Sequence, residues 1–262
     1  MKISIFKNNG DKIEQIEEQI LFLINKYHLS YDENEPDVVF FIGGDGTFLR
    51  AVQHYLSKIE KISFVGINTG TLGFFYDYQS DEIEEVISKI SEGKYSLKTY
   101  PLLNASIKTI NKEESLFAIN EIRIENPFHT LTSDVYINDE YLETFRGNGL
   151  NICTSFGSSG YNRSLGGAVI DNSLNLIELT EIAPIVNNAY RSLGSSLILD
   201  GKNTIKLVGN FTNVVIGYDH LTLSTHGVIE EILLTLSKDK IKLIYTKDRS
   251  YINRLNRSFI KR

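Results

Sequence analysis

A short glycine-rich segment contains a carboxylate that could take part in catalysis. Gly43-Gly44-Asp45-Gly46-Thr47 directly follows the apolar residues 37–42 and opens a segment of helical character at residues 47–57. Glycine lets a backbone approach a ligand closely, and helix N-termini at the end of a buried strand bind phosphate through N–H groups. A carboxylate placed there would repel phosphate unless it binds a metal or accepts a proton. Asp45 is therefore a catalytic candidate, the alternative being that it caps the following helix.

Two further glycine-rich segments could complete such a site. Of the 19 glycines, 12 lie at residues 43–46, 66–73 and 147–167. The second segment follows another apolar run, residues 62–67, so we expect it at the same sheet edge as Asp45, with both loops lining one cleft. The third is flanked by Arg146 and contains Arg163, and an arginine can bind phosphate through two parallel hydrogen bonds. The first segment matches neither the P-loop nor the dinucleotide-binding glycine pattern.

The first hundred residues alternate between strand and helix patterns. Apolar runs at residues 3–6, 37–42 and 62–67 read as strands. Between and after them, apolar residues recur at helical spacing, as in Ile83, Val86, Ile87 and Ile90. This order predicts a parallel sheet with crossover helices.

After Pro101 the pattern changes to short alternating segments, including residues 105–110, 116–125, 134–137 and 141–145. Asn138-Asp139 has the composition of a hairpin turn. Asn120-Glu121 interrupts the apolar pattern of 116–125, and adjacent strand residues point to opposite faces, so only one can face a pocket unless the strand ends there. We expect an α/β plus all-β fold. It has an N-terminal α/β domain at 1–100, to which residues 241–262 return, and a β-sandwich-like domain at 101–240.

The C-terminal segment combines apolar and basic residues. Ile252, Leu255 and Phe259 have helical spacing, so we expect a helix that packs on the first domain. The basic residues of this region are Lys247, Arg249, Arg254, Arg257, Lys261 and Arg262. They could form a polyanion-binding tail, but the simpler interpretation is the solvated face of an amphipathic helix.

Composition excludes several classes of function. A formal charge of −6 over 262 residues argues against non-specific nucleic-acid binding. No stretch approaches the roughly 18 apolar residues of a membrane span, so we expect a cytoplasmic protein without a membrane partner. The lone Cys153 indicates a reducing compartment. The five histidines lack ligand spacing, and we expect no metal ligands in the chain itself.

Several of these motifs together resemble those of the bacterial NAD kinases. Gly-Gly-Asp-Gly-Thr at 43–47 is followed in order by residues 68–74 (NTGTLGF), Asn120-Glu121 and residues 157–168 (GSSGYNRSLGGA). The resemblance runs over nearly the whole chain. The first motif alone also occurs in diacylglycerol-type lipid kinases, and 6-phosphofructokinases carry a similar one, so the later motifs are what select NAD kinase.

The resemblance implies a phosphoryl transfer to the 2′-hydroxyl of the adenosine ribose of NAD, with Asp45 as general base. It implies ATP or polyphosphate as donor, and Mg²⁺ held mainly through the substrate phosphates. A homodimer or homotetramer is the implied assembly. A lone histidine is more often structural than ligand-binding, but His220 is carried over with the other implied binding residues. These are Gly46, Leu49, Phe74, Asn120, Glu121, Arg146, Asn148, Phe156, Ser159, Gly160, Tyr161, Asn162, Arg163, Ser164, Ala183 and His220.

Two positions depart from the family pattern. Asn148 stands where the family usually has aspartate, and it lacks the carboxylate charge. Phe156 replaces a small hydroxyl residue, and it could obstruct the site or stack on a base. Two alternatives therefore accompany NAD kinase: a lipid kinase that shares the Gly-Gly-Asp-Gly-Thr loop, and an NAD(P)-binding sensor whose catalytic site has weakened.

Overall fold

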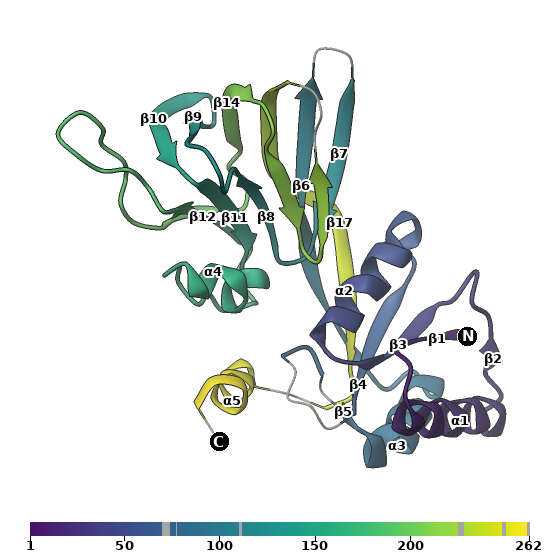
Figure 1. Ribbon diagram of the computed structural model, residues 1–262. Helices are drawn as coiled ribbons and strands as arrows, with labels where there is room; N and C mark the ends of the chain where they lie inside the picture. The colour runs from purple at the N-terminus through teal and green to yellow at the C-terminus, as the bar shows by residue number, and fades with distance from the viewer. Residues whose placement is uncertain (70–73, 77, 110–111, 225–227, 248–249, 261–262) are drawn as a thin grey trace. The chain divides into compact units, whose positions relative to one another are not determined.

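The chain folds into two compact units in its computed structural model (Figure 1). The structure describes residues 1–69, 74–76, 78–109, 112–224, 228–247 and 250–260. One unit comprises Met1–Tyr100 and Asp239–Arg262, and the other comprises Pro101–Lys238. Two long strands, β6 (Ser96–Thr109) and β17 (Ile229–Tyr245), run across the boundaries between the units.

The first unit is built on a parallel sheet, as predicted. Its strands are β1 (Lys2–Lys7), β2 (Ser30–Tyr31), β3 (Val38–Gly43), β4 (Ser63–Asn68) and β5 (Tyr78–Gln79). The central pairs β1–β3 and β3–β4 are parallel, and β17 joins β4 in parallel through Leu243 and Phe64. The helices are α1 (Asp11–Lys26), α2 (Asp45–His54), α3 (Ile83–Ser91) and α5 (Tyr251–Leu255), with short helical turns at Leu56–Lys58, Ser80–Glu82 and Asn256–Ile260.

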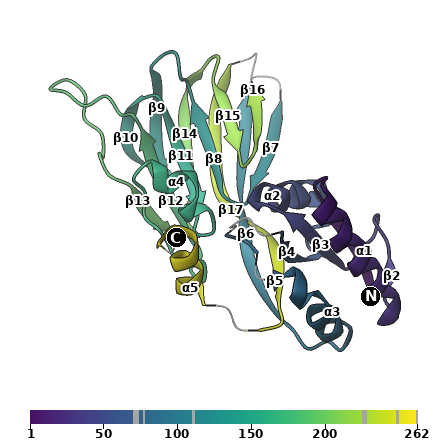
Figure 2. The same ribbon diagram turned by 60° about the horizontal axis from the view of Figure 1, so that its bottom comes forward.

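Alternation along β3 determines which helix covers which face of this sheet. Val38, Phe40 and Ile42 are buried in one cluster with the apolar residues of α1 and α3. Phe41 points the other way, and its ring lies 4.7 Å from that of Phe48 on α2. Helices therefore cover both faces (Figures 1 and 2), which is why β3 is apolar throughout.

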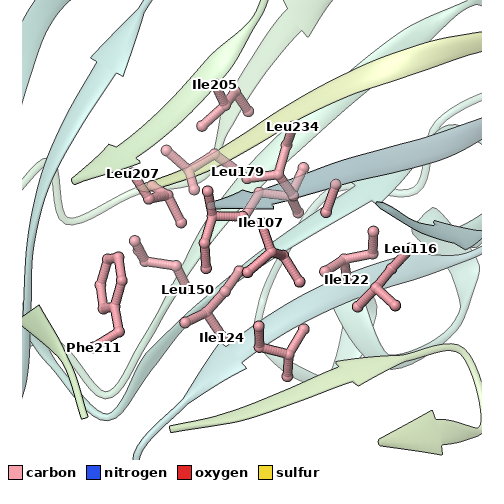
Figure 3. Packing of buried hydrophobic residues seen from close by; sticks show 14 of the residues in the cluster. Ile107, Leu116, Ile122, Ile124, Leu150, Leu179, Ile205, Leu207, Phe211 and Leu234 are labelled. Atoms are coloured by element: carbon pink, nitrogen blue, oxygen red, sulfur yellow. The ribbon is translucent and has the colours of Figure 1, made fainter. Parts of the chain in front are cut away.

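The second unit packs two antiparallel sheets around one core, which agrees with the expected all-β domain. One sheet has the order β13-β12-β11-β8-β15-β16, and the other contains β10-β9-β14-β17, with β6 paired to β7. The strands are β7 (Glu113–Ala118), β8 (Glu121–Glu125), β9 (Leu131–Ile137), β10 (Glu140–Gly147), β11 (Gly149–Thr154), β12 (Leu176–Ile182), β13 (Leu197–Asp200), β14 (Ile205–Phe211), β15 (Val215–Tyr218) and β16 (Leu221–Ser224). Residues of both sheets interlock in the core, among them Leu150, Ile124, Leu207 and Leu234 (Figure 3).

Three local predictions can be compared with these elements. Asn138 and Asp139 both have positive φ, at 50° and 66°, and form the predicted turn between β9 and β10. Residues 116–125 are not one strand, because β7 ends at Ala118 and β8 begins at Glu121. Helix α2 begins at Asp45, two residues earlier than its apolar pattern indicated. Within the described part of the chain, no helix is long and apolar enough to cross a membrane.

Gly66 is required by close packing inside the parallel sheet. A Cβ atom at this position would lie 2.6 Å from Cζ of Phe41 and 3.0 Å from the carbonyl oxygen of Phe75. We expect Gly66→Ala to lower the free energy of unfolding by about 1–3 kcal/mol, because a buried ring and a backbone segment would both have to move. Urea unfolding of the full chain measures the change.

Gly46→Ala is the matched control for this prediction. A Cβ at Gly46 would meet only the flexible end of Arg50, at 3.8 Å. Since alanine favours a helix over glycine, this variant should be as stable as the parent or more stable by up to about 1 kcal/mol. Equal losses in both variants would contradict the packing argument.

Candidate active site

Asp45 is held by the backbone of a second loop. Its Oδ2 accepts the N–H of Phe74 at 2.9 Å, and its Oδ1 accepts the N–H of Phe75 at 3.1 Å. The loop after β3 and the loop after β4 therefore meet, as their shared sheet edge predicted, although residues 70–73 of the second loop lie outside the described part. The capping alternative for Asp45 is wrong. Gly44, which has no side chain, occupies the N-cap position of α2, and both carboxylate oxygens of Asp45 bind the other loop instead.

The glycines around Asp45 shape this loop. Gly43 has a φ of +150°, and a Cβ there would lie 2.4 Å from Oγ1 of the buried Thr47. The N–H of Thr47 in turn donates to the carbonyl of Gly44 at 2.6 Å, which closes the turn into α2. Gly46 is exposed and Leu49 is buried on the same helix. A side chain at Gly43 would break the turn that presents Asp45.

The Asp45 carboxyl is a stronger base than an exposed aspartate. Burial raises its pKa above the ordinary value, while the N–H groups of Phe74 and Phe75 and the guanidinium of Arg254 oppose part of that rise. A carboxylate with a raised pKa holds an accepted proton more firmly, which suits a general base. The geometry and the pKa direction therefore both fit a proton acceptor.

The C-terminal segment packs on this loop, which confirms that it returns to the first domain. The ring of Phe74 lies 6.0 Å from that of Tyr251 and 6.0 Å from that of Phe259. Arg254 is only 6% exposed, so the interpretation of the basic residues as a solvated helix face is wrong for this one. Of the predicted apolar face, Phe259 makes the contact with Phe74, whereas Ile252 is exposed.

In the second unit, Asn120 and Glu121 occupy a sharp corner between β7 and β8. The carboxylate of Asp219 fixes this corner by accepting the N–H of Ile119 at 2.9 Å and that of Asn120 at 2.8 Å. Gly157 packs against the same backbone, and a Cβ there would lie 2.2 Å from the carbonyl oxygen of Asn120. The strand ends at this point, so the rule that adjacent side chains point apart does not apply to Asn120 and Glu121.

This corner presents two acceptors suited to a ligand. Oδ1 of Asn120 and Oε2 of Glu121 are buried and have no hydrogen-bond partner among the residues that the structure describes. Both side chains lie close to Gly160, where an added Cβ would be 4.0 Å from Nδ2 of Asn120 and 3.9 Å from Oε2 of Glu121. Buried acceptors are nearly always satisfied, so hydroxyl or amino donors of a bound molecule would fit here.

Glu121 is protonated more readily than an ordinary glutamate. Burial raises its pKa to about 7, the charge of Asp219 adds to the rise, and Arg123 opposes it. Near neutral pH its carboxyl group can therefore either accept or donate a hydrogen bond.

Two residues of the third glycine-rich segment have side chains that are buried inside the second unit. The side chain of Asn162 is fully buried and donates to Oε2 of Glu178 at 2.8 Å, while its Oδ1 accepts from Thr180 at 2.8 Å. Phe156 is 2% exposed, so its ring packs inside the unit. Both side chains therefore support the segment from within.

Other predicted residues of this segment lie nearer the surface. Tyr161 is partly exposed, and the guanidinium of Arg123 lies 4.7 Å from its ring centroid. Ser159 is partly exposed as well. Gly160, Arg163 and Ser164 are exposed. These are the residues of the segment that a ligand could reach.

The remaining predicted binding residues lie at the two ends of β8, with Arg146, Asn148 and Ala183 towards the Glu125 end and His220 at the Glu121 end. Arg146 stacks on Tyr190 at 4.6 Å, and Asn148 uses its Nδ2 to donate to the carbonyl of Asn126 at 3.3 Å. Ala183 is exposed with a φ of 46°, and His220 is exposed next to Asp219. The Asn148 amide thus donates a hydrogen bond to a nearby backbone carbonyl, and this contact does not require a carboxylate at position 148.

Sequence reasoning missed two residues of these sites. The sequence predicts a binding role for His220 and none for its neighbour Asp219. Asp219 has a φ of 49°, a conformation that aspartate adopts more readily than most residues. Arg254 was assigned to a solvated face, and nothing in the local pattern distinguishes it from Arg257. Long-range contacts alone reveal the roles of both.

Comparisons with known proteins point to one family. The family models described as the ATP-NAD kinase N-terminal domain and the ATP-NAD kinase C-terminal domain match residues 5–95 and 120–244. The chain is 35% identical to NAD kinase 1 of Listeria monocytogenes over 264 residues, which cover 100% of both chains. Its fold is similar to yeast NADH kinase complexed with NADH, with a TM-score of 0.84 at 20% identity over 98% of this chain and 86% of that one. It is also similar to an NAD kinase from Archaeoglobus fulgidus in complex with ATP, with a TM-score of 0.77 at 20% identity over 98% and 99% of the two chains.

The raised pKa of Glu121 predicts a stability that falls with rising pH. An unfolded glutamate loses its proton near its ordinary pKa of 4.5, whereas the folded chain keeps it until about pH 7. Between these values the native state binds more protons, so the contribution of Glu121 to the free energy of unfolding declines as pH rises. The difference between a pKa of 4.5 and one of about 7 corresponds to roughly 3 kcal/mol of unfolding free energy.

Glu121→Gln isolates that contribution, because glutamine does not titrate. We expect the stability of the variant, relative to the parent, to rise by about 2–3 kcal/mol between pH 4.5 and pH 8.5. Urea unfolding at several pH values measures it. A difference between the two proteins that stays constant with pH would show that Glu121 ionises normally.

Proposed function

The chain belongs to the NAD kinase family and makes NADP from NAD with ATP, and we propose that Asp45 is the general base of this phosphoryl transfer. The observation that supports the role of Asp45 is its position. It stands at the first turn of α2, at the end of a buried parallel strand, with a carboxylate oriented by two backbone N–H groups. The lipid kinase alternative is not supported, since both family models and the relative named above are NAD kinases.

We propose that the 2′-hydroxyl of the adenosine ribose gives its proton to Asp45 while its oxygen forms a bond to the terminal phosphorus of the donor. The bond from that phosphorus to the bridging oxygen breaks, and ADP leaves when ATP is the donor. A carboxylate has about four acceptor positions, so Asp45 can take the hydroxyl proton while both N–H bonds remain. Polyphosphate as an alternative donor would follow the same exchange of bonds.

We propose that the second unit binds NAD around the β7–β8 corner. The unpartnered acceptors of Asn120 and Glu121 suit the donors of a ribose or an adenine amino group. Gly160 lies close to that corner, and the resemblance implies that its neighbours Ser159 and Tyr161 also contact the dinucleotide. Arg146, Arg163 and Ser164 would supply phosphate contacts, and Gly46, Leu49 and Phe74 would line the side of Asp45. Asn162 and Phe156 would support this surface from within, and His220 follows Asp219 at the corner. Asn148 and Ala183 lie at the other end of β8, beside Asn126 and Ile182, and we propose them as further contacts of the dinucleotide.

Mg²⁺ would enter with the donor and be held mainly by its phosphate oxygens, which are the hard ligands that this ion prefers. It would neutralise charge that develops on the transferred group. Both oxygens of Asp45 already accept N–H bonds, and this is consistent with a proton acceptor more than with a dedicated metal ligand. We place the enzyme in the cytoplasm, since the lone Cys153 suits a reducing compartment.

The Asp45→Asn variant tests the base directly. It keeps the size of the side chain and removes the proton acceptor, so we expect turnover to fall at least about a hundredfold. NADP formation from NAD, ATP and Mg²⁺ is the measurement, with polyphosphate as a second donor. NAD affinity should change little, because Asp45 acts on the reacting hydroxyl and not on the rest of the dinucleotide.

Asp37→Asn is the matched control. Asp37 is an exposed aspartate just before β3, at the opposite end of the strand, and this variant should keep the turnover of the parent. Near-normal turnover of Asp45→Asn would refute the base. A parent protein that binds NAD tightly but forms no NADP would instead support the sensor alternative.

The resemblance also predicts a homodimer or homotetramer. The surface of the second unit offers apolar side chains that could form such contacts, including the exposed Tyr141, Val186 and Ile198. Light scattering of the purified chain at micromolar concentration should give two or four times its mass of 29.7 kDa. A monomer under those conditions would remove this proposal.

A further inference from the structure

We propose that Arg254, on the C-terminal helix α5, is a positioning residue for the phosphoryl transfer. It holds Phe74 in place, so that the N–H groups that orient Asp45 stay fixed, and its positive charge keeps Asp45 in the proton-accepting form. This inference rests on the proposed role of Asp45 as general base. It extends the active site to the last helix of the chain.

The geometry links Arg254 to Asp45 through one residue. The guanidinium carbon of Arg254 lies 5.6 Å from the ring centroid of Phe74, and the backbone N–H of Phe74 donates to Asp45. The other end of the guanidinium is fixed, because its Nη2 donates to the hydroxyl of Tyr245 at 3.2 Å. A planar cation between a ring face and a hydroxyl has little freedom to turn.

The burial of Arg254 needs compensation. At 6% exposure this guanidinium has lost most of its contact with water, which is costly for a charge without partners. The face of Phe74, the hydroxyl of Tyr245 and the nearby charge of Asp45 all offset that cost. An arginine that served only to keep the helix soluble would lie on its exposed side, where Ile252 is 67% exposed.

The rest of the helix is docked in a way that fixes the position of Arg254. The rings of Tyr251 and Phe259 both contact Phe74, and the hydroxyl of Ser250 caps the helix by accepting the N–H of Asn253. Arg257 donates to the carbonyl of Tyr76 at 3.1 Å. These contacts hold the 74–76 segment at several points. Among them, Arg254 contacts Phe74, whose N–H binds Asp45, and its charge also acts on Asp45.

Among the described residues, the charged or titratable groups that interact with Asp45 are Arg254 on α5 and Tyr76 on the 74–76 segment. Arg50, one turn along α2, acts on Tyr76. Burial and the charge of Asp45 raise the pKa of Tyr76 far above neutrality, so its phenol stays uncharged. Arg50 contacts Asn8 and Thr47. Arg254 is therefore the cation that opposes the effect of burial on the pKa of Asp45.

Neutral variants at this position test the inference through the pH profile of kcat/KM. A general base must be ionised, so activity falls as pH drops below its pKa. Without the positive charge the pKa of Asp45 rises, and in Arg254→Gln and Arg254→Met the acid limb should move up by roughly 0.5–1 pH unit. We also expect kcat to fall about tenfold while the KM for NAD stays within about twofold, because the loss affects the reacting groups only.

Two further variants separate charge from packing. Arg254→Lys keeps the charge but not the planar contact, so its acid limb should match that of the parent while kcat falls. Arg257→Gln removes a neighbouring arginine of the same segment, and its acid limb should also be unchanged. Thermal unfolding and NAD binding check that each variant is folded. If Arg254→Gln loses the contact with the ring of Phe74, Arg254→Met keeps an apolar side chain against it.

The outcomes are distinct. An acid limb that stays at the position of the parent in an active, folded neutral variant overturns the role of Arg254 and leaves Asp45 as the base. An equal shift in Arg257→Gln overturns it as well, since any change in the helix would then suffice. Absence of NADP formation by the parent protein would overturn the proposed function itself. An upward shift confined to the neutral variants at position 254 supports the inference.

Discussion

The central interaction in this molecule is the binding of one carboxylate by the backbone of another loop. Asp45 begins the helix that follows a strand covered by helices on both faces, and Phe74 and Phe75 donate their N–H groups to its carboxylate. An isolated aspartate in a glycine loop would have many orientations. The two hydrogen bonds select one, and the buried surroundings make the group a stronger base.

A second carboxylate has the same structural role in the other unit. Asp219 binds the N–H groups of Ile119 and Asn120 and so turns the chain between β7 and β8. At that turn, acceptors of Asn120 and Glu121 are buried without a hydrogen-bond partner in the described part of the chain. In both units, therefore, a carboxylate binds two backbone N–H groups, and the residues proposed for catalysis or binding lie at that contact.

Much of the fold followed from the sequence because its signals are local. The helical spacing of Ile83, Val86, Ile87 and Ile90 predicted α3, and Asn138-Asp139 predicted the hairpin turn between β9 and β10. The sequence leaves the break between β7 and β8 open, because two polar residues, Asn120 and Glu121, interrupt the apolar pattern of residues 116–125 without showing whether the strand ends there. Packing of Gly157 on the backbone of Asn120 and the contact with Asp219 produce the break, and both are distant in sequence.

The sequence by itself determined the family, the two kinds of sheet and the candidate base, since motif spacing and residue periodicity are properties of neighbouring residues. Only the tertiary structure decided which charged side chains are buried. Arg254 and Arg257 have similar sequence surroundings, yet Arg254 is buried with its guanidinium over the ring of Phe74. Its burial depends on contacts between segments that are some 180 residues apart in the chain, which no local pattern encodes.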